Sequence, residues 1–179
     1  MSEIRGSKGF GLMIGIVIAG MAVTALNMSI MNIALPPIMA ELDITASTAQ
    51  WLITGYILVT GVLVPVSAFL VQKFSYKQLF LVSMAFFTVG SFVCAFSSTF
   101  AVLLAGRILQ AVGGGILMPL GINVFLAMFP VEKRGSAMGL LGLGMILAPA
   151  LGPTISGYVI ENYDWNILFY AMAVIGIGK

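Results

Sequence analysis

Long runs of apolar residues, separated by short polar segments, dominate this sequence. A bilayer span takes about 20 predominantly apolar residues. Five runs are of this kind, at residues 10–35, 51–71, 79–96, 100–129 and 137–160. A sixth run, 167–178, is too short to cross alone. We therefore predict five membrane-spanning helices and part of a sixth, all within one helical membrane domain that covers residues 1–179.

The connections between the runs are short, and several contain residues that interrupt helices: Pro36, Pro37, Ser97, Ser98 and Pro130. Proline removes a backbone donor and clashes with the preceding turn, so we expect helices to end at these points. The connections leave no room for a soluble domain.

The composition supports a polytopic, all-α membrane protein. Hydrophobic residues make up 60% of the chain and charged residues only 8%, against about 25% charged residues in soluble domains. The net charge of +2, with no basic run, argues against nucleic-acid binding. Histidine is absent and Cys94 is the only cysteine, so we expect no metal site, no cofactor and no disulfide.

The basic residues flank the runs on one side only: Arg5, Lys8, Lys73, Lys77, Lys133 and Arg134. The positive-inside rule names that side as cytoplasmic. Acidic residues occupy the opposite connections: Glu41, Asp43, Glu161 and Asp164. We therefore predict a multi-pass protein of the cytoplasmic membrane with a cytoplasmic N-terminus. A cleaved signal peptide is the alternative for the first run, but the run is long and lacks a small-residue cleavage site.

Arg107 is the one charged residue inside an apolar run. An arginine at the centre of a membrane costs roughly 2.5 to 3.5 kcal/mol even on a lenient scale, so it marks a functional site. Gln110, Gly113 and Gly114 follow one or two helical turns later and form a polar, small stripe with it. The alternative is an arginine that reaches the interface through its long side chain.

Two polar residues in other runs are candidates for the same network. Asn27 lies about eight residues from the outer end of its run and Arg107 about seven, so the two share a depth. We expect Asn27 to accept a hydrogen bond from Arg107, although an asparagine that only bridges two packed helices is an equal alternative. Tyr56 either lines the same cavity or lies in a packed interface.

Small residues recur at every fourth position of the run 137–160: Gly144, Ala148, Gly152 and Ser156. Two prolines lie beside them, Pro149 and Pro153. Small residues let helix backbones approach closely, and proline loosens the local turn. This combination indicates a surface on which two rigid units slide or seal, with ordinary tight packing as the alternative.

Several segments together resemble the major facilitator superfamily, specifically the N-terminal portion of its fourteen-helix drug:proton antiporter branch, which includes lincomycin-resistance-like exporters. Leu103, Arg107, Gln110 and Gly113 match the fourth-helix pattern Leu-x-x-x-Arg-x-x-Gln-Gly-x-Gly, with Ala111 in place of its first glycine. Gly144, Pro149 and Gly152 match the antiporter signature Gly-x-x-x-Gly-Pro-x-x-Gly, with Ala148 in place of its second glycine. The segments 26–36, 50–56 and 164–165 also resemble this branch.

The resemblance implies roles for three groups of residues. A proton-coupling or substrate network would comprise Arg107, Gln110, Asn27 and Tyr56. Helix packing at the antiporter motif would involve Gly144, Ala148, Pro149, Gly152, Pro153 and Gly157. The cytoplasmic loop keeps the positive charge of the family's gating pattern but lacks its aspartate, and its residues are Gln72, Lys73 and Lys77.

One departure affects the mechanism directly. Asn27 stands where this branch usually has an acidic residue, and no carboxylate lies within any predicted span. A proton-binding role at that position is therefore not supported by the sequence.

We predict the N-terminal six-helix half of a transporter, with the sixth helix incomplete, rather than an enzyme. When complete, the protein would export lipophilic small molecules in exchange for protons by alternating access. Its expected partners are the lipid bilayer, the lipophilic substrate, protons, and a missing C-terminal half or a full-length homologue. The alternative is a truncated, non-transporting membrane subunit or regulator that associates with such a homologue.

Overall fold

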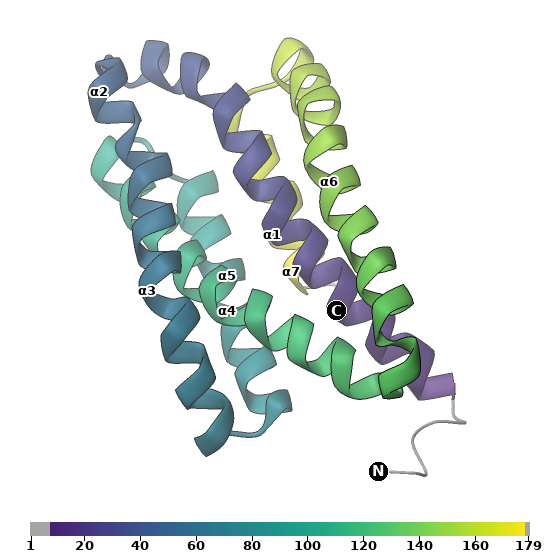
Figure 1. Cartoon of the computed structure of the whole chain (residues 1–179). Coiled ribbons are helices and arrows are strands. Elements are labelled where there is room, and N and C mark those ends of the chain that lie inside the picture. The colour runs from purple at the N-terminus through teal and green to yellow at the C-terminus, as the bar shows by residue number, and fades with distance from the viewer. Residues whose placement is uncertain (1–7, 178–179) are drawn as a thin grey trace.

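The computed structural model describes residues 8–177, which form helices and connecting turns with no strand among them. Side chains are described for 18–176, apart from those of residues 128, 137, 140, 148 and 149. The all-α prediction is confirmed. In chain order (Figure 1) the elements are α1 (Lys8–Glu41), α2 (Ala46–Ala49), α3 (Trp51–Lys73), α4 (Tyr76–Ala95), α5 (Phe100–Met128), η2 (Val131–Lys133), α6 (Arg134–Asn162) and α7 (Asn166–Ile177).

Five helical segments are long and apolar enough to cross a membrane: Ile18–Glu41, Ala46–Lys73, Tyr76–Ala95, Phe100–Ala127 and Val131–Asn162. Each segment contains all or most of one of the five long apolar runs predicted from the sequence. The shorter apolar helix Asn166–Gly176 covers most of the sixth run, and the last residue of that run lies outside the described residues.

The expectation that Pro36 and Pro37 end the first helix is wrong, because α1 continues through both to Glu41. Each proline lacks the amide hydrogen that would bond to the carbonyl four residues earlier. Its fixed φ is nevertheless close to the helical value, so a long helix tolerates the loss. The other breaks agree with expectation, since Ser97 and Ser98 lie between α4 and α5, and Pro130 follows α5.

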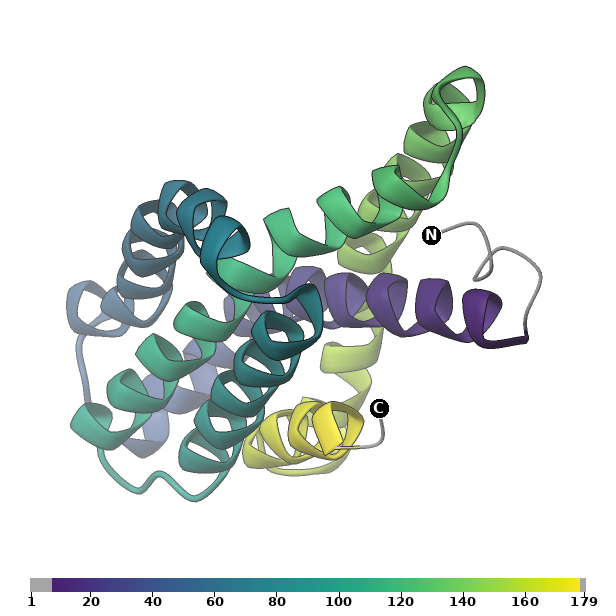
Figure 2. The same ribbon diagram turned by 90° about the horizontal axis from the view of Figure 1, so that it is seen from below.

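α5 lies at the centre of the bundle (Figures 1 and 2) and packs against α3, α4 and α1. α6 packs along α1, and α7 packs against α4 and α1. α1 and α3 contact each other over only a short stretch and diverge away from α2, with α5 between them (Figure 1). The residues of α5 that face inward therefore meet three other helices.

Glycines bring α4 and α5 into close contact. A Cβ atom added at Gly90 would lie 2.7 Å from the carbonyl oxygen of Gly106. One added at Gly106 would lie 2.9 Å from the backbone nitrogen of Cys94, and one at Gly113 would lie 2.7 Å from that of Phe87. Contacts this short with backbone leave no space for a side chain, so the two helices touch through their backbones.

A hydrogen bond joins the end of α1 to the start of α7. Trp165 Nε1 donates to Glu41 Oε2 over 2.5 Å, and the indole is only 2% exposed. Its ring packs edge-on against Phe169. This contact fixes the position of α7 beside α1, at the end of the bundle opposite to the α3–α4 connection.

Candidate functional site

Arg107 lies at the centre of a buried polar network. Thr99 caps the N-terminus of α5, and Arg107 follows two turns later with 1% of its surface exposed. Its Nη1 donates to Asn27 Oδ1 and to Gln110 Oε1, each over 2.9 Å, and its Nε donates to the carbonyl oxygen of Leu52 over 3.3 Å. The buried guanidinium thus binds groups on α1, α3 and α5, and it does not reach toward the interface.

Tyr56 covers one face of this guanidinium. The Arg107 Cζ atom lies 4.5 Å from the centroid of the Tyr56 ring, and Tyr56 is 1% exposed. A desolvated cation over an aromatic face gains about 2 kcal/mol. The Tyr56 ring is therefore packed against Arg107, in the interface between α3 and α5.

Gln110 extends the network to α4. Its Nε2 donates to Ser91 Oγ over 2.8 Å, and Ser91 Oγ donates to the carbonyl oxygen of Phe87 over 2.8 Å. Because its nitrogen is committed to Ser91, the Gln110 side-chain oxygen faces Arg107. Ser91 was not predicted from the sequence, because it is one of several hydroxyl residues in its run and only its position next to Gly90 sets it apart.

The charge of Arg107 is balanced by dipoles. Within residues 18–176, its hydrogen-bond acceptors are two side-chain amides and a backbone carbonyl, and none of them is a carboxylate. The acidic residues in this part of the chain lie at helix ends or in turns: Glu41, Asp43, Glu132, Glu161 and Asp164. An arginine keeps its proton, so this network can bind an electron-rich group or orient a helix, but it cannot carry a proton itself.

Three buried polar atoms on α1 and α3 lack a hydrogen bond of good geometry among the described residues: Asn27 Nδ2, Tyr56 Oη and Thr60 Oγ1. The Tyr56 hydroxyl lies within reach of the Asn27 and Thr60 side chains. Buried polar groups are nearly always hydrogen-bonded, so each exception requires an explanation. The same part of the chain contains no group of three His, Cys, Asp or Glu residues that could hold a metal ion.

Of the glycines on α6, Gly152 is the one that packs closely against α1. A Cβ atom added at Gly152 would lie 2.7 Å from Ser29 Cβ. Ser156 is buried and donates to the Gly152 carbonyl oxygen over 2.6 Å. By contrast, nothing lies within 4 Å of a Cβ built at Gly144 or Gly157.

The structure describes only one of the three remaining predicted side chains of α6. Pro153 is exposed, and the side chains of Ala148 and Pro149 lie outside the described residues. The structure therefore brings Gly152, but not Gly144 or Gly157, against another helix.

The predicted cytoplasmic loop lies far from Arg107. Arg107 contacts the first turns of α3, whereas Lys73 ends that helix 21 residues after Leu52, about 30 Å along the axis. Gln72, Lys73 and Lys77 are exposed, and Lys73 Nζ lies 4.6 Å from the centroid of the Phe69 ring. The structure does not bring these three residues to the Arg107 network.

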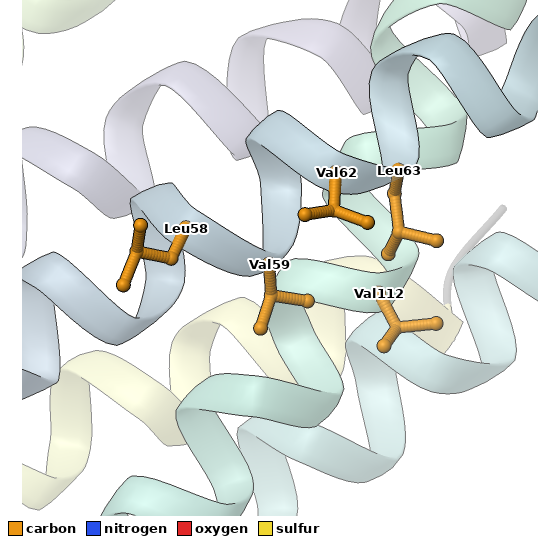
Figure 3. Close-up of a pocket in the computed structure, with 5 residues that line it drawn as sticks. All are labelled: Leu58, Val59, Val62, Leu63 and Val112. Carbon is orange, nitrogen blue, oxygen red and sulfur yellow. The ribbon is translucent and has the colours of Figure 1, made fainter.

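A shallow apolar depression lies on the outer side of α3 and α5 (Figure 3). Its lining residues are Leu58, Val59, Val62, Leu63 and Val112. It presents no polar group, and none of the five residues takes part in the Arg107 network. It offers only apolar contact and no site for chemistry.

Bilayer-length helices around a buried, charged polar network are typical of multi-pass membrane transport proteins. Sequence comparison identifies the family: the model of the Major Facilitator Superfamily matches residues 11–178. The chain belongs to this superfamily.

Individual relatives agree with this assignment. The uncharacterized MFS-type transporter YhcA of Bacillus subtilis is 50% identical over 161 residues, which cover 90% of this chain and 30% of YhcA. The lincomycin resistance protein LmrB of the same organism is 49% identical over 159 residues, which cover 89% of this chain and 33% of LmrB. This chain thus spans about a third of the length of these relatives.

Solved structures show the same fold. A crystal structure of the peptide transporter POT superposes with a TM-score of 0.81 at 16% identity, covering 93% of this chain and 35% of POT. The prediction that the helices form part of a major facilitator fold is confirmed.

Proposed function

We propose that this chain is the N-terminal half of a secondary active exporter that exchanges lipophilic drugs for protons by alternating access. The observation that carries the proposal is Arg107, buried at the meeting point of α1, α3 and α5 and tied to α4 through Gln110. A buried charge at a helix junction marks a transport site in membrane proteins. The name of the relative LmrB supports a drug as the cargo.

Arg107, Gln110, Asn27 and Tyr56 form the proposed substrate and coupling network. Alternating access needs helices that move as rigid units about a site near the midplane. Arg107 holds three helices through neutral acceptors, so its contacts change when any of these helices moves. The proton itself is carried by a group outside this network, because the network contains no carboxylate.

Two further groups have supporting roles in the proposal. The α6 face would seal the site against leakage through Gly144, Ala148, Pro149, Gly152, Pro153 and Gly157. The exposed residues Gln72, Lys73 and Lys77 would orient the α3–α4 connection at the cytoplasmic surface. The N-terminus then lies in the cytoplasm and the protein in the cytoplasmic membrane.

The test is export by the full gene product that contains these residues, produced in drug-sensitive bacteria. We expect it to lower the cellular accumulation of lincomycin or a lipophilic dye, with loss of export when the proton gradient is collapsed. Arg107→Ala should abolish export, whereas the exposed control Arg134→Ala should not. Export and proton dependence that survive Arg107→Ala would contradict the assignment of Arg107.

A further inference from the structure

Only one of the two polar atoms of the Asn27 side chain takes part in a hydrogen bond. Its Oδ1 accepts a hydrogen bond from Arg107, so its Nδ2 points elsewhere as a donor. That nitrogen is buried and makes no hydrogen bond of good geometry among the described residues. Asn27 is 1% exposed, so solvent does not satisfy it either.

Two hydroxyl groups on α3, Tyr56 Oη and Thr60 Oγ1, are also buried without a hydrogen bond of good geometry within the described part of the chain. Tyr56 Oη lies within reach of both Thr60 and Asn27, so the three groups form one cluster. The residues are four apart and so lie on one face of α3. That face meets α5, because a Cβ atom at Gly114 would lie 2.6 Å from Tyr56 Oη, and one at Gly115 would lie 3.2 Å from Thr60 Cα.

Two of these three groups lie against the guanidinium, and the Thr60 hydroxyl lies beside that of Tyr56. Asn27 binds Arg107 directly, and the Tyr56 ring lies over its face. The assembled groups are a cation, an amide donor and two hydroxyls, with no carboxylate among the described neighbours. Such a set is complementary to a hydrogen-bond acceptor and repels a cation.

The cost of leaving these donors unpaired favours binding of an acceptor. Each buried, unsatisfied group destabilises the closed arrangement, and a ligand that satisfies several of them shifts the equilibrium toward the arrangement that holds it. α1 and α3 contact each other over only a short stretch, so a ligand that enters between them leaves the larger interfaces of α5 intact.

We propose that Arg107, Asn27 Nδ2, Tyr56 Oη and Thr60 Oγ1 bind a carbonyl or carboxylate oxygen of the transported molecule, which enters between α1 and α3. This inference rests on the proposed function and narrows its cargo to lipophilic molecules that carry such an acceptor. A molecule with only a cationic group is excluded from this position.

Three naphthalenes of similar size test the proposal: 2-naphthamide, 2-naphthoate and 2-methylnaphthalene. The full gene product is placed in lipid nanodiscs, and probe retention is measured by equilibrium dialysis, with empty nanodiscs subtracted. The amide and the carboxylate report the two acceptor types, and the hydrocarbon reports apolar contact alone. We expect the wild type to retain both acceptor probes more tightly than the hydrocarbon.

The variants Tyr56→Phe and Thr60→Val remove one hydroxyl each. Each should weaken retention of the acceptor probes by about fivefold and leave the hydrocarbon unchanged, as expected for one hydrogen bond. The control pair Tyr158→Phe and Thr154→Val removes two exposed hydroxyls at the same spacing on α6 and should change nothing. Thr60→Ser keeps the hydroxyl and should retain wild-type binding even if Thr60→Val folds poorly.

Two results overturn the proposal: a wild type that shows no preference for the acceptor probes, or site variants that behave like the control pair. The experiment also distinguishes failure of this inference from failure of the proposed function. Probe binding that depends on Tyr56 without any drug export contradicts the proposed function alone. Drug export by a protein whose probe binding ignores Tyr56 and Thr60 contradicts this inference alone.

Discussion

Arg107 Nη1 and Asn27 Oδ1 lie 2.9 Å apart although the two residues are separated by 80 positions in the chain. A neutral amide receives the hydrogen bond at a position where the resemblance of the sequence to drug:proton antiporters predicts an acid. The contact keeps its donor and acceptor whatever the pH, because neither group titrates in the physiological range. It holds α1 to α5 without responding to protons.

Asn27→Ala should destabilise the bundle. It leaves a buried guanidinium with one acceptor fewer, which costs about 1 to 3 kcal/mol. We expect the melting temperature of the purified protein to fall by several degrees. Asn27→Asp keeps an acceptor in place and should melt near or above the wild type. Asn32→Ala, which alters an exposed asparagine of the same helix, provides the control; equal melting of both alanine variants would contradict the role of Asn27.

Gln110→Leu should destabilise the protein at least as much. Gln110 bonds to Arg107 and to Ser91, so its loss takes one hydrogen bond from each of two buried partners. The matched change Gln50→Leu affects an exposed glutamine that makes no capping bond and should have little effect. Thermal unfolding followed by circular dichroism distinguishes the two, and similar curves for both variants would mean that the buried network contributes little to stability.

Gly113→Ala should separate α4 from α5. The added methyl group would meet the backbone of Ser83 and Phe87, which cannot move aside without shifting a helix. Gly61→Ala, also within a helix, meets nothing within 4 Å. Alanine favours helix over glycine by about 1 kcal/mol, so Gly61→Ala should be neutral or stabilising. The measurement is the melting temperature of each variant in the same detergent, and a neutral Gly113→Ala would contradict the close packing.

Arg107→Lys should impair export although it preserves the charge. An ammonium group at the end of a flexible stem cannot reproduce the planar set of donors that reaches Asn27, Gln110 and Leu52 together. We expect drug export to fall by at least tenfold while the protein still inserts into the membrane. Export at the wild-type rate would show that charge alone suffices at this position.

The sequence predicts the helical architecture well because membrane spans need only length and apolar composition. Each of the five long runs lies in a helix of sufficient length. The predicted end of the first helix was wrong, because proline interrupts a long, packed helix less readily than a short one. The short helix α2, which Thr45 caps, was not predicted, because its four residues carry no apolar pattern.

The site was predictable in part. Arg107 and Gln110 stand out as polar residues at helical spacing in an apolar run, and depth alone placed Asn27 beside them. Ser91 and Thr60 could not be found this way. Serine and threonine are common in membrane helices, and only the three-dimensional packing shows which of them lie beside other buried polar groups. The roles of all these residues in transport stay predictions.

The hydrogen bond between Trp165 and Glu41 supplies the protein with its own optical probe. The chain has two tryptophans, and Trp51 is 54% exposed while Trp165 is buried against a carboxylate. The two indoles should therefore emit at different wavelengths, and Trp51→Phe would isolate the emission of the buried one. A red shift of that emission during turnover would record water reaching the junction of α1 and α7, in real time and without any attached label.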